Sequence, residues 1–175
     1  RVAVVDTVPV VEFEYVTGRS LRTILDRARG VGGANPNPIP PDQVLAIIDK
    51  IVASLEALGT LRSEKGRLLH GALIPQFVWI SDSGDIRVAG QLLGAALIRA
   101  LATPAIAQQF VPYVAPEIRA TGEPTKASEV FASGAILYAL LTGQEPPDAA
   151  SREAFDLALA RPIAAASKAP LPDEL

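Results

Sequence analysis

The residue types that could do chemistry in this chain are few, and they do not form a recognised catalytic set. His70 is the single histidine among 175 residues. It has no aspartate, serine or second histidine close to it in the sequence, which disfavours a catalytic triad or a histidine metal site. We therefore expect it to be a packed core residue. Glu117 and Glu129 are the candidate acid pair for general acid–base work. Three glycines lack the spacing of a phosphate-binding loop: Gly71, Gly84 and Gly90.

The composition excludes several classes of protein. The 16 Lys and Arg against 19 Asp and Glu give a net charge of −3, which does not favour a nucleic-acid partner. Only 20% of the residues are charged, so the chain is not a disordered segment. The absence of cysteine excludes disulfides and thiolate chemistry. The longest apolar run, Ala132 to Gly143, is shorter than the roughly 18 residues that span a bilayer, so no membrane contact is expected within this segment.

The apolar pattern predicts helices joined by short hairpins. Apolar residues recur every three to four positions after Pro41, which predicts a helix from Pro41 or Asp42 to about Leu61. The other expected elements, in chain order, are a hairpin of Val2–Val5 with Val8–Val16, a helix capped by Ser20 and ending at Gly30, a loop over Gly30–Pro41, a hairpin of Phe77–Ile80 with Ile86–Ala89, a loop or short helices over Leu92–Pro112, a buried central helix Ser128–Thr142, and a short helix Ser151–Ala160.

Five segments, in this order, resemble the protein kinases. His70 to Phe77, "HGALIPQF", resembles the catalytic loop pattern H-x-D-x-K-x-x-N, and Tyr113 to Glu117, "YVAPE", resembles the end of the activation segment. The spacings also fit the family: seven residues from His70 to Phe77, thirteen from Phe77 to Gly90, and twelve from Glu117 to Glu129. The other three matching segments are "VEFEYVTGRSL" (Val11–Leu21), "RVAGQL" (Arg87–Leu92) and "SEVFASGAILYALLTG" (Ser128–Gly143).

The resemblance implies a mainly α fold, the large lobe of a kinase of the bacterial serine/threonine type. Residues 1–17 would be the last small-lobe strands and the hinge, and residues 18–175 a large lobe without its closing helices. The small-lobe remnant would be one short β-hairpin, and a second β-hairpin would lie at the degenerate catalytic loop. Since the chain has no methionine and begins with Arg1, we expect it to be an excerpt of a longer protein. A cytoplasmic location is implied as well.

The same resemblance implies that the kinase chemistry has been lost. The position of the catalytic aspartate is Ala72, and that of the catalytic lysine is Ile74. The metal-binding asparagine position is Phe77, and the D-F-G aspartate position is Gly90. Phosphoryl transfer needs a carboxylate base and oxygen ligands for Mg²⁺. We therefore expect no catalytic, cofactor-binding or metal-binding residue in this chain, and no ATP or Mg²⁺.

Phe77 and Trp79 are expected to take over the nucleotide cleft. They lie two apart on a predicted strand and so face the same side, which by the resemblance is the floor of the nucleotide site. The alternative is that both are ordinary core residues, with the strand shifted by one residue so that Val78 and Ile80 are exposed. By the resemblance, His70 packs in the core of the lobe, and Glu117 and Glu129 anchor loops through hydrogen bonds.

Three functions stay open. The first is an inactive pseudokinase that binds or regulates other proteins through its surfaces, namely the Ser151–Ala160 helix, the Gly30–Pro41 loop or the groove near Phe110. The second is an atypical kinase-like enzyme that binds a nucleotide in an altered pose. The third is a purely structural or dimerisation lobe. Three acids could replace lost ligands under the second hypothesis: Glu14, Asp82 and Asp85.

Overall fold

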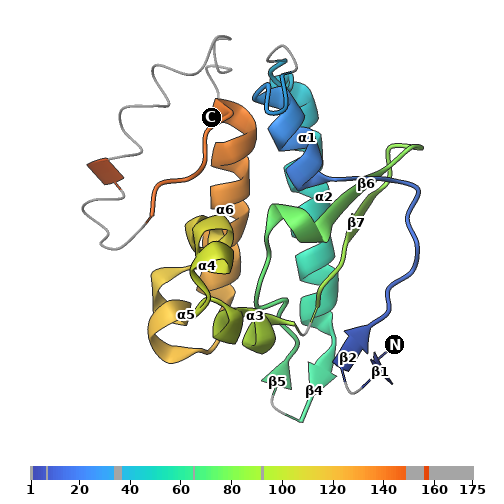
Figure 1. The fold of residues 1–175 in the computed structure, drawn as a ribbon, viewed down its shortest axis with the longest axis vertical. Helices are drawn as coiled ribbons and strands as arrows, with labels where there is room; N and C mark the ends of the chain where they lie inside the picture. Colours follow the sequence, from blue (N-terminus) through green and yellow to red (C-terminus); the bar gives the residue numbers. More distant parts are fainter. Residues whose placement is uncertain are drawn as a thin grey trace.

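Two long helices form the centre of the fold in the computed structural model of the chain, which describes residues 2–6, 8–33, 37–64, 66–91, 93–148 and 156–157. Helices α2 (Pro41–Thr60) and α6 (Lys126–Thr142) pack against each other (Figure 1). Val44, Ile47 and Ile51 form the buried face of α2. This confirms the expected helix pair, with nearly the boundaries that the sequence predicted.

Helix α6 is fixed at both ends by local hydrogen bonding. The Thr125 hydroxyl accepts a hydrogen bond from the Ser128 N–H (3.1 Å), and the Ser128 hydroxyl accepts one from the Thr125 N–H (2.9 Å). This reciprocal capping box satisfies two N–H groups at the start of the helix. Gly143, with φ +68°, ends it in the left-handed conformation. Most of α6 is buried, but Val130 is 66% exposed. The expected buried central helix is therefore present, but it has one exposed side, on which Val130 lies.

A three-stranded antiparallel sheet contacts α2 through its last strand. Its order is β3 (Gly18–Ser20), β6 (Val78–Ser81) and β7 (Ile86–Val88). The β6–β7 hairpin confirms the prediction to within a residue, whereas β3 is too short to give a periodic pattern. Gly18 allows β3 to approach β6 closely, because a Cβ there would lie 2.1 Å from the carbonyl oxygen of Ile80.

Helix α1 (Leu21–Ala28) follows β3 directly and begins as predicted. The Ser20 hydroxyl accepts a hydrogen bond from the Thr23 N–H at the first turn. Leu21 and Leu25 are fully buried and join the main core. The helix therefore ties the end of β3 to the main core.

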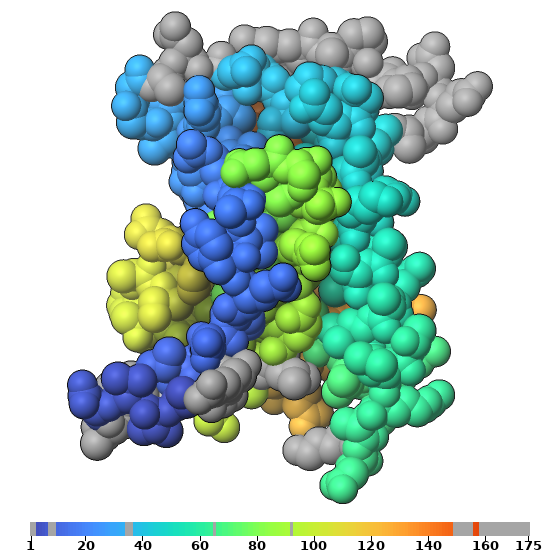
Figure 2. Space-filling model, turned by 90° about the vertical axis from the view of Figure 1, so that its right-hand side faces the viewer, coloured from blue at the N-terminus to red at the C-terminus, as the bar shows by residue number. Residues whose placement is uncertain are grey.

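The N-terminal hairpin stands apart from the rest of the molecule. It pairs β1 (Val2–Val5) with β2 (Val8–Val11), and Figure 2 shows it projecting from the lower end of the body. The expected strand over Val8–Val16 is wrong beyond Val11. Phe13 and Tyr15 are 47% and 87% exposed. No strand among the described residues pairs with residues 12–16, and a lone extended segment gains no ladder hydrogen bonds.

Short elements complete the described fold. Two of them, α3 (Gly94–Ala100) and α4 (Pro104–Phe110), are the short helices that the sequence allowed between Leu92 and Pro112. No helix among the described residues is long and apolar enough to cross a membrane. The predicted Ser151–Ala160 helix lies outside the described residues except for positions 156–157. The remaining elements are β4 (Arg62–Ser63), β5 (Gly66–Arg67), η1 (Pro75–Phe77), η2 (Val111–Tyr113) and α5 (Pro116–Thr121).

Candidate functional site

The loop that begins at His70 is anchored on α6 by Glu129. The Glu129 carboxylate accepts hydrogen bonds from the backbone N–H groups of His70 and Gly71. Burial raises the pKa of Glu129, and the two N–H donors oppose that rise. Glu117, the other candidate acid, lies exposed at the start of α5. Of the proposed acid pair, Glu129 has the loop-anchoring role that we expected.

His70 is a buried, hydrogen-bonded core residue. It is 1% exposed, and its Nε2 lies 2.7 Å from the carbonyl oxygen of Ala89. The Ala72 N–H donates to Nδ1 (3.4 Å), so the ring proton lies on Nε2 and is donated to Ala89. Burial lowers the pKa of His70, although the bond to Ala89 opposes this shift. The ring is thus neutral and links the loop to the end of β7.

Phe77 and Gly90 fit each other sterically. A Cβ built on Gly90 would lie 2.7 Å from two ring atoms of Phe77, so the ring occupies the space where a side chain at position 90 would begin. Gly90 also has φ +83°, a conformation that favours glycine. The Phe77 ring contacts the main core and lies 6.2 Å from the His70 ring, centroid to centroid. A side chain at position 90 and the present position of Phe77 exclude each other.

Trp79 has different surroundings from Phe77. Phe77 ends the short helix η1, and the strand begins only at Val78, so the two aromatic residues do not share one strand as expected. Val78 is fully buried and Ile80 packs against the core, so the alternative register that would expose them is wrong. Trp79 lies on the opposite face of β6, between Ser20 of β3 and Arg87 of β7. It is half-buried and outside the core cluster.

The positions next to His70 are closed over by the segment that follows Gly90. Ala72 is 5% exposed and Ile74 is fully buried. The backbone of Gly94, the first residue of α3, packs directly on Gly71, because a Cβ on Gly94 would lie 2.8 Å from the Gly71 carbonyl. Leu97 of α3 then packs against the main core. Helix α3 therefore begins directly against the loop at Gly71.

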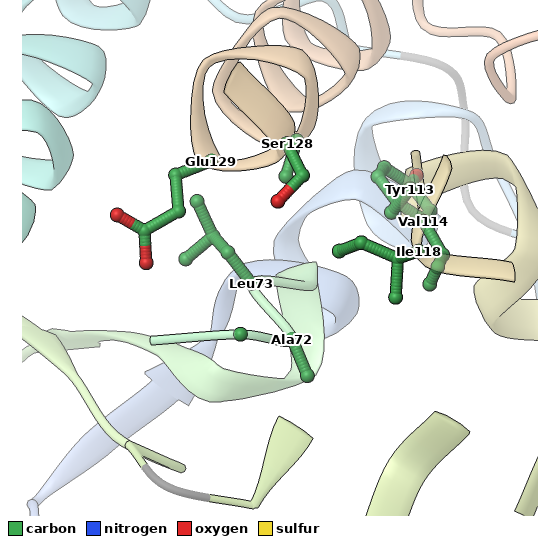
Figure 3. Close-up of a pocket in the computed structure, with 9 residues that line it drawn as sticks. Ala72, Leu73, Tyr113, Val114, Ile118, Ser128 and Glu129 are labelled. Atoms are coloured by element: carbon green, nitrogen blue, oxygen red, sulfur yellow. The ribbon is translucent and has the colours of Figure 1, made fainter. Parts of the chain in front are cut away.

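A small pocket remains beside this loop. Figure 3 shows Ala72 and Leu73 facing Tyr113, Val114 and Ile118, with Ser128 and Glu129 contributed by α6. Its volume is about 10 Å³. That is room for about one water molecule, far below the roughly 300–1,000 Å³ of small-molecule sites.

A network of charged side chains on Glu145 joins three parts of the lobe. The Glu145 carboxylate accepts hydrogen bonds from Arg22 (2.5 Å), from Arg29 and from the Tyr113 hydroxyl (2.8 Å). Burial alone would raise the pKa of Glu145, but these donors outweigh it and lower the pKa. Arg22 also pairs with Asp26 (2.5 Å). The sequence did not predict this cluster, since its members are far apart in the chain and belong to no motif.

The acids considered as substitute ligands are not gathered into a site. Asp82 and Asp85 lie in the exposed turn between β6 and β7, where Asp85 accepts a hydrogen bond from the Ser83 hydroxyl (2.8 Å). Glu14 lies in the exposed segment after β2. Within the described ranges, no group of three or more His, Cys, Asp or Glu residues could hold a metal ion.

The described fold is mainly α with small antiparallel sheets, which confirms the expected fold class and agrees with the large lobe of a kinase-like protein. No family model matches the chain. The chain is 30% identical over 143 residues to the serine/threonine-protein kinase PknL of Mycobacterium tuberculosis, covering 79% of this chain and 32% of that protein. It is 28% identical over 147 residues to the serine/threonine-protein kinase PrkC of Bacillus subtilis, covering 83% and 21%. It is 31% identical over 146 residues to the PTI1-like tyrosine-protein kinase 1 of Arabidopsis thaliana, covering 79% and 39%.

The chain is therefore related to the protein kinase superfamily, over a segment that corresponds to part of the large lobe. The resemblance to bacterial serine/threonine kinases is also confirmed. The chain spans 32% and 21% of the length of the two bacterial relatives.

Proposed function

We propose that this segment is a pseudokinase lobe, which transfers no phosphate and acts by binding or regulating other proteins. The observation that carries the proposal is the packing of Phe77 on Gly90 beside a buried Ala72. By the resemblance, these positions belong to the metal ligands and the catalytic base. Residues 1–17 are proposed as the end of a small lobe and residues 18–175 as the large lobe. The proposal includes a cytoplasmic location.

The physical reason is that these side chains offer neither charge nor oxygen. A positioned base contributes about 10²–10⁴ in rate, and Mg²⁺ is required to neutralise the phosphate oxygens during transfer. Phe77 fills the space beside Gly90 with an apolar ring, and the closed loop leaves Ala72 little contact with solvent. A substrate hydroxyl would find no acceptor at this position.

The test is phosphate transfer by the full-length protein. We expect no incorporation of labelled γ-phosphate into a generic protein substrate, and no heat of ATP binding at millimolar ATP, with or without Mg²⁺. Ala72→Asp alone should stay inactive, because the positions of Phe77 and Gly90 still supply no metal ligand. Transfer by the unaltered protein at a rate that scales with its concentration would refute the proposal.

A further inference from the structure

The hairpin of β4 and β5 holds two arginines directly opposite each other. Arg62 pairs with Arg67 in the antiparallel register, and Ser63 pairs with Gly66 next to the turn. The Leu68 N–H donates to the Leu61 carbonyl (3.1 Å), so Arg62 and Arg67 are the non-hydrogen-bonded pair between two hydrogen-bonded ones. Side chains lie closest together at such positions. The two guanidinium groups therefore start from neighbouring Cβ atoms on one face.

This arrangement is unfavourable for the hairpin itself. Like charges directly opposite each other destabilise a strand pair. Both arginines are exposed, and neither guanidinium has an ion-pair or hydrogen-bond partner within the described residues. The exposed Glu64 of the turn does not pair with either of them. A local conflict of this kind, without a compensating contact inside the fold, is typical of a binding site.

The chemistry of the pair selects an oxyanion as its ligand. Two guanidinium forks side by side present planar N–H donors that match carboxylate geometry. The hairpin lies at one end of the molecule, beyond the C-terminal end of α2 (Figure 1), where a partner can reach it. The net charge of −3 and the acidic pI do not favour the extended basic surface on which nucleic-acid binding depends, whereas a short acidic segment needs only the local arginine pair.

We propose that the β4–β5 hairpin is a docking surface for an acidic segment of a partner protein, held by Arg62 and Arg67. The inference rests on the proposed function in giving the lobe a binding role, and deepens it by naming the chemistry of the partner.

The experiment measures binding of a fluorescein-labelled peptide of glutamates to the full-length protein, by fluorescence anisotropy. We expect Arg62→Gln/Arg67→Gln to bind about tenfold or more weakly, since two charge-assisted contacts are lost. The matched control is Arg87→Gln/Arg99→Gln, which removes the same charge from two exposed arginines on β7 and α3 and should bind as the parent does. Equal losses in both variants, or none in either, would overturn the assignment.

Two further readouts separate the alternatives. The thermal midpoint of Arg62→Gln/Arg67→Gln should equal or exceed that of the parent, because a repulsive pair is removed. A lowered midpoint would show that the arginines are structural and overturn the inference. Single-stranded oligo(dT) of equal charge should bind more weakly than the peptide, and tighter binding would also overturn it. Phosphate transfer by a protein that binds the peptide through this hairpin would refute the proposed inactivity alone.

Discussion

The contact between Phe77 and Gly90 gives the sharpest test of the candidate site. Gly90→Ala introduces a Cβ at 2.7 Å from the ring atoms of Phe77 and places a non-glycine residue at φ +83°. The left-handed conformation costs about 1–2 kcal/mol, and overpacking adds about 1–3 kcal/mol. We therefore expect the free energy of unfolding to fall by about 2–5 kcal/mol in total.

The two contributions can be separated with matched variants. Gly84 has nearly the same backbone angle, φ +87°, and a Cβ there would meet nothing within 4 Å. Gly84→Ala should therefore show the conformational cost alone, about 1–2 kcal/mol. Phe77→Ala removes the ring and should relieve the clash but not the backbone cost. Combined with Gly90→Ala, it should destabilise by about 1–3 kcal/mol less than the sum of the single effects.

Urea unfolding, followed by far-UV circular dichroism, measures all four free energies in this cycle. The fluorescence of Trp79, the one tryptophan of the chain, gives a second probe of the same transition. If the effects of Phe77→Ala and Gly90→Ala are additive within about 0.5 kcal/mol, the ring does not lie against position 90 and the reasoning is refuted. The same holds if Gly90→Ala is no worse than Gly84→Ala.

Three further predictions concern titratable groups. Glu129→Ala should lower the free energy of unfolding by about 2–4 kcal/mol, because it leaves the N–H groups of His70 and Gly71 without an acceptor. Glu129→Gln keeps an acceptor oxygen and should lower it by less. Equal effects of the two variants in urea unfolding would contradict this prediction. The His70 ring should titrate by NMR with a pKa below 6.5, so stability should decrease as the pH falls below about 6.5, where the unfolded chain takes up the proton first. Glu145→Gln should cost about 1 kcal/mol at pH 7, a modest value because the carboxylate is partly exposed. Since the pKa of Glu145 is lowered in the folded protein, the stability difference between the parent and Glu145→Gln should disappear as the pH falls through that pKa. If urea unfolding shows a constant difference down to acidic pH, Glu145 does not accept these hydrogen bonds as a carboxylate.

The long helices could be predicted from the sequence because each carries its own signal. The apolar spacing after Pro41 and the glycine at position 143 mark helix boundaries within a single stretch of chain. The segment over Val11–Tyr15 shows the limit of this reasoning. Its alternation of apolar residues and glutamate is typical of a strand, but a strand also needs a neighbour, and none pairs with it among the described residues.

Contacts within the candidate site were less predictable, since they depend on side chains brought together from distant segments. The sequence suggested that Phe77 and Trp79 would share a face, and the helical turn at Pro75–Phe77 changed the direction of Phe77. The Glu145 cluster carried no sequence signal at all, because a glutamate after a helix has many possible partners. The loop-anchoring role of Glu129 was available only through the resemblance to the kinases.

If kinase chemistry has been lost as proposed, the way positions 77 and 90 fit together argues against two unrelated substitutions. Two independent losses would leave either a cavity or a clash between the changed side chains. Here the larger side chain at position 77 uses the space that the missing side chain at position 90 leaves open. Reversal at either position alone is therefore unfavourable: Gly90→Asp meets the ring, and Phe77→Asn removes apolar packing beside His70. Both would have to change together to supply the proposed metal ligands, so under the proposed function the packing itself opposes a return to kinase chemistry.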